Sequence, residues 1–341
     1  MSNPKLRLGL MGFGHIGRQV YHLATESEDI EIVAVSDIGK PEILHYLLDS
    51  DSIDGIENTL QGNYLVNSKF ETRMMQTDRP EEVPWDIFNL DAVIDATGKF
   101  ESRADMEAHL GNGAQRVLIS TLPVDHIDRL IIQGINEDSA SAEDRMISVG
   151  SPTTTALALV LKILSDKFAV ECASMTTVHA YTSDQPLQDY AGKDFRRSRS
   201  AAENVIPNTI ESPQWVEKIL PQFAGKLNGH ALNVPVQKGS LLDLNLVFER
   251  EDISIEAVNE ALREAKSNYP GVVDVVEDPV VSSDVIGNRH SVVFDAPGTI
   301  KAGRRIIKTL SWYESLGHAA RMLDVARQYA AIDSMGGEKC A

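Results

Sequence analysis

Three glycines near the start of the chain form a pattern that can bind a dinucleotide. Gly12, Gly14 and Gly17 have the spacing G-x-G-x-x-G, which permits a tight turn, a close approach to a pyrophosphate, and close packing of a helix on a strand. Asp37 follows, 20 residues after Gly17, and a carboxylate there can accept hydrogen bonds from ribose hydroxyls. Because that carboxylate repels a 2′-phosphate, the pattern favours NAD over NADP. The alternative is a purely structural glycine turn.

The elements around the glycines supply the context that this pattern requires. Residues 6–10 predict a strand that ends at the glycines, residues 18–26 predict a helix, and residues 30–35 predict a second strand. Apolar runs then alternate with helix-like stretches, and these runs are residues 92–95, 117–120 and 130–135. Such alternation predicts an α/β domain, a Rossmann doubly wound parallel sheet over residues 1–151.

The pattern changes near residue 150. An apolar stretch at residues 153–168 predicts a helix, and residues 254–267 predict an amphipathic helix with Ser254 as its N-cap. Longer strands are predicted at residues 170–181, 232–250, 291–295 and 306–313. Leucines that alternate with polar residues from Leu242 to Leu246 indicate a mixed or antiparallel sheet with one buried face. We expect an α+β domain at residues 152–316, a last helix at 317–331 and a loose tail at 332–341.

Composition limits the classes of partner. The chain has 341 residues with 32 Lys+Arg against 50 Asp+Glu, a net charge of −18, which repels phosphate backbones and anionic membranes. No run of eighteen apolar residues and no secretory signal pattern occurs. Two cysteines, Cys172 and Cys340, cannot form a disulfide framework. We therefore expect a cytoplasmic protein with no nucleic acid, membrane or metal partner.

Short motifs follow one another in a fixed order along almost the whole chain. They are Gly12-Phe13-Gly14-His15-Ile16-Gly17-Arg18, Ala96-Thr97-Gly98-Lys99-Phe100, Arg116-Val117-Leu118-Ile119-Ser120, Thr176-Thr177-Val178-His179-Ala180-Tyr181-Thr182, Asp184-Gln185, Lys193-Asp194-Phe195-Arg196-Arg197-Ser198-Arg199, Gly225-Lys226-Leu227 and Ser311-Trp312-Tyr313. In order and spacing the chain resembles phosphorylating glyceraldehyde-3-phosphate dehydrogenase. The resemblance implies a Rossmann domain, a catalytic-type domain, a final helix packed on the Rossmann domain, and a homotetramer built on an S-shaped loop around residues 183–203.

The resemblance also implies NAD as cofactor and a set of residues that bind it. These are Gly12, Phe13, Gly14, His15, Ile16, Gly17, Asp37, Thr97, Gly98, Ser120 and Ser315. The chain departs from the family at Met11, His15, Ala191 and Arg79, and Ser315 stands where the family has the asparagine that fixes the nicotinamide amide. We expect NAD to bind, more weakly than in the enzymes.

The reactive position differs most from the family pattern. The family carries its nucleophilic cysteine in a Ser-Asn-Ala-Ser-Cys-Thr-Thr-Asn run, and this chain reads Ser148-Val149-Gly150-Ser151-Pro152-Thr153-Thr154-Thr155. Pro152 at the nucleophile position removes both the thiol and the backbone N–H that would help hold the oxyanion. Ser151 as a helix N-cap and Pro152 as the first helical residue is a good structural explanation of the same sequence.

The phosphate-binding positions have changed as well. Asn233 stands at the arginine that binds the substrate phosphate in the family, and Val236 replaces the threonine of the same run. Ile210 and Glu211 replace a Thr-Gly pair at the inorganic phosphate site, where a carboxylate is repulsive. The family residues that survive on the substrate side are His179, Ser151, Thr153, Thr182, Asp184 and Arg197.

Other nucleophiles are poor substitutes. Cys172 lies seven positions before His179 on one predicted strand, about 23 Å at 3.3 Å per residue. Ser151 or Thr153 could form an acyl intermediate with His179 as base, but Pro152 would still remove the oxyanion donor. His179 could equally be a packed histidine, and Arg196, Arg197 and Arg199 an ordinary solvated run.

Two functional hypotheses remain. The first is an NAD-binding pseudoenzyme that lacks phosphorylating dehydrogenase activity and acts in regulation or assembly, as a homotetramer or as a hetero-oligomer with an active homologue. The second is an NAD-dependent oxidoreductase for a different, unphosphorylated aldehyde or alcohol, with His179 as base. A cofactor-reduction assay separates them.

Overall fold

The computed structural model describes residues 5–51, 56–192 and 194–337. The chain divides into two compact units, residues 1–151 with 318–341 (unit 1) and residues 152–317 (unit 2). Cys340 lies outside the described residues. Among the described helices, none has both the length and the apolar character needed to cross a lipid bilayer.

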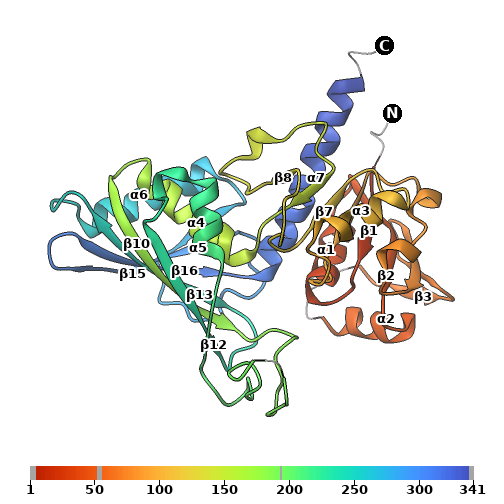
Figure 1. Cartoon of the computed structure of the whole chain (residues 1–341), viewed down its shortest axis with the longest axis horizontal. Helices are drawn as coiled ribbons and strands as arrows, with labels where there is room; N and C mark the ends of the chain where they lie inside the picture. Colours follow the sequence, from red (N-terminus) through yellow and green to blue (C-terminus); the bar gives the residue numbers. More distant parts are fainter. Residues whose placement is uncertain (1–4, 52–55, 193, 338–341) are drawn as a thin grey trace. The chain divides into compact units, whose positions relative to one another are not determined.

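Unit 1 contains a nine-stranded sheet in the order β3-β4-β5-β2-β1-β6-β7-β9-β8. Figure 1 labels β1, β2, β3, β7 and β8 of this sheet. Its strands are β1 (Leu6–Met11), β2 (Ile30–Asp37), β3 (Thr59–Gln61), β4 (Tyr64–Val66), β5 (Glu71–Gln76), β6 (Ala92–Asp95), β7 (Val117–Ile119), β8 (Arg129–Leu130) and β9 (Met146–Ser148). From β5 to β8 all neighbours are parallel, and the β3–β4 hairpin adds antiparallel pairs at one edge. The predicted doubly wound parallel sheet is confirmed.

The central strands of unit 1 are apolar on both faces. In β1 every residue except Arg7 is buried, as expected for a parallel strand with covered faces. Strands β3, β4 and β5 were not predicted, because β3 and β4 are only three residues long and β5 mixes charged and polar residues with its two methionines. The run predicted at residues 130–135 contributes only Leu130 to a strand, since β8 ends there.

The helices of unit 1 begin where the sequence supplies a start signal. They are α1 (His15–Glu26), α2 (Pro41–Ser50), α3 (Arg103–Gly111) and most of α7 (Ser315–Gly337), with short 3-10 turns η1 (Pro80–Glu82), η2 (Trp85–Phe88) and η3 (Glu137–Ser139). Ser102 and Asp105 form a reciprocal capping box at α3. The prediction of a loose tail from residue 332 was wrong for residues 332–337, which continue α7. An ion pair from Arg116 to Asp333 at 2.7 Å holds this last stretch, a contact that local periodicity does not show.

Unit 2 is built on a seven-stranded mixed sheet in the order β11-β12-β10-β13-β16-β15-β14. Its strands are β10 (Val170–Ala180), β11 (Ile206–Asn208), β12 (Leu227–Val234), β13 (Ser240–Phe248), β14 (Val273–Val276), β15 (Val292–Ala302) and β16 (Ile306–Tyr313). The predicted α+β class is confirmed. The single strand predicted at residues 232–250 was wrong: a turn at residues 235–239 separates β12 from β13, because Gly239 has φ +82° and Pro235 interrupts the ladder.

Helices cover the sheet of unit 2 (Figure 1). They are α4 (Pro152–Ser165), α5 (Ser212–Ile219) and α6 (Ile255–Asn268), with a 3-10 turn η4 (Pro221–Phe223). Residues alternate between buried and half-buried along all of β13, as the leucine pattern predicted. Helix α4 is buried over most of its surface and contacts β10, β13, β15 and β16. Ser254 caps α6, as predicted, by accepting a hydrogen bond from the backbone N–H of Ala257.

Candidate functional site

The glycine turn between β1 and α1 has the geometry of a phosphate-binding turn. Gly12 has φ +87°, and a Cβ there would lie 2.8 Å from the backbone nitrogen of Thr97. A Cβ on Gly17 would lie 2.1 Å from the carbonyl oxygen of Gly12, so both positions require glycine for packing. Gly14 differs, because its Cβ would meet nothing within 4 Å. The open space beside Gly14, in front of the amino end of α1, leaves room for a pyrophosphate.

Asp37, at the end of β2, is tied to this turn. Its carboxylate accepts hydrogen bonds from the backbone N–H of Phe13 at 2.6 Å and of Gly39 at 2.8 Å. These two bonds use part of the acceptor capacity of a carboxylate. The carboxylate is therefore held at the carboxyl edge of the sheet, beside the glycine turn, and can still accept from a ribose.

The next strand ends bring further predicted residues to the same edge. Thr97 follows β6 and donates to Asp95 through both its N–H (2.9 Å) and its hydroxyl (2.6 Å). Ser120 follows β7, and its N–H donates to the carbonyl of Asp95 at 3.0 Å. Gly98 adopts φ +64° directly after Thr97. Parallel strands thus align the ends of β1, β2, β6 and β7, the place where open α/β sheets bind ligands.

The remaining predicted cofactor residues lie at the ends of helices. His15 and Ile16 form the first turn of α1, where His15 Nε2 lies 3.2 Å from Gln19 Nε2. Ser315 is the first residue of α7 and belongs to unit 2. Ser151 precedes α4 directly, and α4 begins at Pro152 as the Ser-Pro pair predicted.

A cluster of buried hydroxyls, centred on Tyr313, lies beside His179 in unit 2. The Tyr313 hydroxyl hydrogen-bonds Thr153 at 2.8 Å and Thr177 at 2.5 Å. The rings of His179 and Tyr313 meet edge to face with centroids 6.2 Å apart. The first turn of α4, strand β10 and the end of β16 are thereby joined. Tyr313 and Thr177 were missed as site residues; the i, i+2 spacing of Thr177 and His179 on one strand was the available signal.

Electrostatics keep this cluster neutral. Burial lowers the pKa of His179. Two weaker effects raise this pKa: the hydrogen bond between the ring and the backbone of Ala180, and the negative charge of Asp184. Nδ1 lies 2.5 Å from the carbonyl oxygen of Ala180, so Nδ1 carries the proton and Nε2 the lone pair. Burial also raises the pKa of the Tyr313 phenol. At neutral pH the cluster therefore offers a neutral imidazole and hydroxyl groups.

The predicted phosphate positions carry no positive charge. Asn233 is paired with His179 across the parallel β10–β12 ladder and is only 7% exposed. Its side-chain oxygen lies 3.5 Å from the amide nitrogen of Asn208. Glu211 is exposed at the start of α5. A phosphate beside His179 would therefore find an amide where a guanidinium is needed.

Three surviving family residues do come together. The hydroxyl of Thr182 donates to the carboxylate of Asp184, and Arg197 forms an ion pair with the same carboxylate. Arg199 is paired separately with Asp189 at 3.0 Å. The basic run therefore has most of its charge compensated by neighbouring carboxylates.

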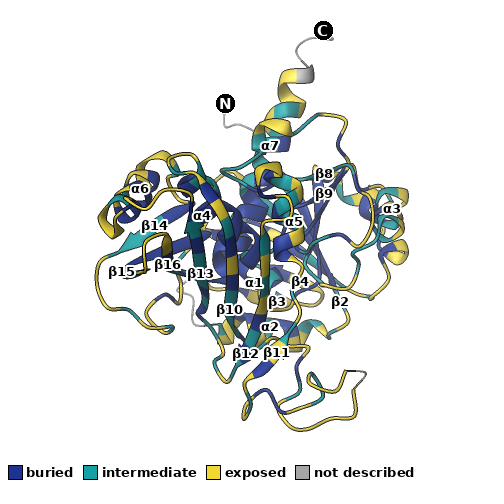
Figure 2. Cartoon of the chain, turned by 60° about the vertical axis from the view of Figure 1, so that its left-hand side comes forward, coloured by how far each residue is buried: buried dark blue, intermediate teal, exposed yellow. Residues whose placement is uncertain are grey.

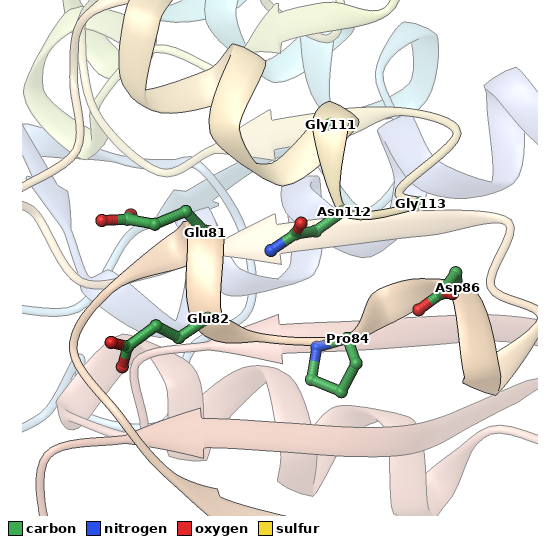
Figure 3. Close-up of a pocket in the computed structure, with 7 residues that line it drawn as sticks. All are labelled: Glu81, Glu82, Pro84, Asp86, Gly111, Asn112 and Gly113. Carbon is green, nitrogen blue, oxygen red and sulfur yellow. The ribbon is translucent and has the colours of Figure 1, made fainter.

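A cavity of about 330 Å³ lies elsewhere in unit 1 (Figure 3). Its lining includes Glu81, Glu82, Asp86 and Asn112. These residues belong to the segments between β5 and β6 and between α3 and β7, and none of them is a predicted cofactor residue. Within the described residues no group of side chains suited to hold a metal ion occurs.

Comparisons with known proteins agree with this geometry. Residues 6–103 match the glyceraldehyde 3-phosphate dehydrogenase NAD binding domain, and residues 151–315 match the C-terminal domain of the same enzyme. Glyceraldehyde-3-phosphate dehydrogenase of Priestia megaterium is 38% identical over 333 residues, covering 96% of this chain and 98% of that protein. Glyceraldehyde-3-phosphate dehydrogenase 1 of Bacillus subtilis is 38% identical (95% and 98% covered), and that of Borreliella burgdorferi is 35% identical (95% and 99% covered).

The fold and the glycine turn define an NAD-binding protein of the dehydrogenase class, and NAD is its cofactor. The predicted resemblance is confirmed: the chain belongs to the glyceraldehyde-3-phosphate dehydrogenase family.

We predict that NAD binds more tightly than NADP, and that Asp37→Asn reduces this preference at least about tenfold. The amide keeps an oxygen for the N–H of Phe13 but removes the charge that repels a 2′-phosphate, and like charges at close range cost several kcal/mol. Calorimetric titration of wild type and variant with both nucleotides measures the ratio. If the ratio of NAD affinity to NADP affinity is unchanged in the variant, another feature, such as Ala191, governs the choice of cofactor.

Proposed function

We propose that this chain is an NAD-binding family member that does not catalyse the phosphorylating oxidation and instead acts in regulation or assembly. One observation carries the proposal: α4 begins with Pro152 at the position of the family nucleophile. A proline has neither a thiol to attack an aldehyde nor an N–H to hold the resulting oxyanion. In the domains we assign, residues 1–151 bind NAD, 152–316 carry the altered substrate site, and the helix from 317 joins the first domain.

The surroundings of Pro152 support this proposal. The Thr153 hydroxyl is bonded to Tyr313, whose phenol stays protonated because burial raises its pKa. Thr153 is therefore not poised as a nucleophile activated by His179. Cys172, the free cysteine of the described residues, lies on the same strand as His179, about 23 Å along it. Asn233, at the predicted position of the substrate phosphate, and Glu211, at that of inorganic phosphate, supply no positive charge.

The cofactor set that we assign belongs to unit 1, apart from Ser315 of unit 2. It contains Gly12, Phe13, Gly14, His15, Ile16, Gly17, Asp37, Thr97, Gly98 and Ser120, with Ser315 assigned from unit 2. The substrate-side set that we assign contains Ser151, Thr153, Thr182, Asp184 and Arg197, together with His179. If the chain is a pseudoenzyme, the substrate-side residues either hold an effector or only maintain the fold.

A second candidate function is a direct oxidation of an unphosphorylated aldehyde hydrate or alcohol. The neutral His179 favours it, because Nδ1 is bonded to Ala180 and Nε2 keeps a lone pair that can take a proton. Bound NAD would supply the hydride acceptor. The loss of charge at Asn233 agrees with a substrate that carries no phosphate.

A cofactor-reduction assay separates the two functions. With NAD and a panel of unphosphorylated aldehydes and alcohols, a pseudoenzyme gives no NADH above background. Turnover that survives extensive purification and falls at least about a hundredfold in His179→Gln would establish the second function instead. The phosphorylated substrate, tested with inorganic phosphate, serves as the reference.

We further propose that the long loop around residues 183–203 makes subunit contacts in a cytoplasmic homotetramer, or in a hetero-oligomer with an active homologue. Figure 2 shows many exposed residues along this loop. Phe195 is 96% exposed, and Tyr190 and Leu187 are also exposed, an unusual concentration of apolar surface for an isolated chain. Sedimentation with and without a purified active homologue tests both assemblies.

A further inference from the structure

His318 links the long C-terminal helix to the edge of the sheet that holds the glycine turn. It lies near the start of α7 and is 2% exposed. Its Nε2 lies 2.9 Å from the carbonyl oxygen of Ser120. Because a carbonyl only accepts, Nε2 carries the proton and donates. The other ring nitrogen, Nδ1, is buried without a hydrogen-bond partner among the described protein atoms.

The partner of His318 occupies a particular place in the sheet. Ser120 follows β7 directly, and its own N–H donates to the carbonyl of Asp95 at the end of β6. Its backbone is therefore held from both sides, by β6 and by α7. The length of the bond from His318, 2.9 Å, is that of an ordinary hydrogen bond.

The half of the sheet formed by β6 and β7 has a defined task in a dinucleotide fold. Such a sheet consists of two mononucleotide-binding halves, and the ligand crosses between them where the strand order reverses. The glycine turn and Asp37 belong to β1 and β2, and therefore to the adenosine half. Ser120 and Thr97 then belong to the half that takes the nicotinamide mononucleotide.

We propose that His318 is a positioning residue for the nicotinamide half of NAD, acting through the carbonyl of Ser120. This inference rests on the assignment of Ser120 to the cofactor site under the proposed function. Burial lowers the pKa of His318 to about 4, with Arg321 adding to the effect, so the imidazole remains neutral and a stable donor at physiological pH.

The test compares two ligands that differ in the nicotinamide alone. NAD and ADP-ribose are titrated calorimetrically into the wild type, His318→Leu and His318→Gln. Loss of one hydrogen bond predicts that His318→Leu raises the Kd for NAD roughly three- to tenfold and leaves that for ADP-ribose within about twofold. His318→Gln, whose amide can still donate, should restore most of the NAD affinity.

A buried histidine of the same unit provides the matched control. His22 on α1 is also buried, and burial lowers its pKa as well, yet it lies on the adenosine side. We expect His22→Leu to change the two affinities by equal factors. ADP-ribose binding also reports that each variant is folded, so a lost fold cannot imitate the predicted split.

The possible failures are distinguishable. Equal weakening of NAD and ADP-ribose in His318→Leu, or no weakening of either, would overturn the positioning role and leave the cofactor site intact. Failure of the wild type to bind ADP-ribose would overturn the site assignment itself. Because the assay measures binding without turnover, the presence or absence of dehydrogenase activity does not affect its outcome.

Discussion

Pro152→Cys should not by itself restore the phosphorylating oxidation of glyceraldehyde 3-phosphate. The substitution supplies a thiol and an N–H at the first turn of α4. Loss of a nucleophile alone can lower the rate by a factor on the order of 10⁶, and the new thiol addresses only that part of the loss. The substrate phosphate would still meet Asn233, and the attacking phosphate would still meet Glu211. A charge-assisted hydrogen bond contributes roughly 1.5–3 kcal/mol, so Asn233 alone costs about ten- to a hundredfold.

The combined variant tests whether several changes separate the chain from its active relatives. Pro152→Cys, Ile210→Thr, Glu211→Gly and Asn233→Arg together should give clearly higher turnover than Pro152→Cys, measured as NADH formation with phosphate present. The new thiol should be reactive in both variants, because a helix amino terminus and a neighbouring imidazole lower a thiol pKa. Iodoacetamide reactivity against pH reports this independently of turnover.

The reactivity measurement makes the comparison interpretable. A reactive thiol without turnover in Pro152→Cys, together with activity in the combined variant, is the expected result. High turnover from Pro152→Cys alone would instead indicate an enzyme silenced by a single change, and would show that Asn233 and Glu211 do not occupy the phosphate sites. Detectable activity in the wild-type chain would contradict the proposed function directly.

The second large effect concerns acid stability. Burial holds the pKa of His318 at about 4 in the folded chain, against about 6.5 in an unfolded chain. As the pH falls below 6.5, His318 binds a proton in the unfolded state but stays neutral in the folded state. The contribution of His318 to the free energy of unfolding, which is fully present above pH 6.5, is therefore lost between pH 6.5 and 4. The linkage relation gives a loss of about 2–3 kcal/mol by pH 4.5 from this one group.

His318→Gln removes the titrating ring and keeps an N–H donor for Ser120. We expect its free energy of unfolding, from urea titrations at pH 7, 5.5 and 4.5, to fall by about 2–3 kcal/mol less than that of the wild type over this range. His179 and His22, whose pKa values burial also lowers, remain in both proteins and leave a common acid-labile component. His230→Gln at an exposed position serves as control; if the two glutamine variants behaved alike, the assignment to His318 would be wrong.

Local sequence determined the nucleotide-binding half of this protein in detail. The spacing of Gly12, Gly14, Gly17 and Asp37 depends on contacts between adjacent elements, a strand, a turn, a helix and a strand, so their geometry follows from about thirty residues. The start of α4 at Pro152 is local for the same reason, because helix capping acts within one turn. The alternation in β13 likewise predicted which face is buried.

Only the tertiary structure decided how the cluster of hydroxyls beside His179 is assembled. Tyr313 joins Thr153 and Thr177, which lie 160 and 136 residues away in sequence, and His318 reaches Ser120 across 198 residues. The last turns of α7 depend on Arg116, 217 residues before Asp333. Helical and strand periodicity reports which face of an element is apolar, but a single buried hydroxyl or imidazole satisfies its hydrogen bonds wherever the chain brings a partner. That choice follows from the packing of strands and helices distant in sequence, and no local pattern records it.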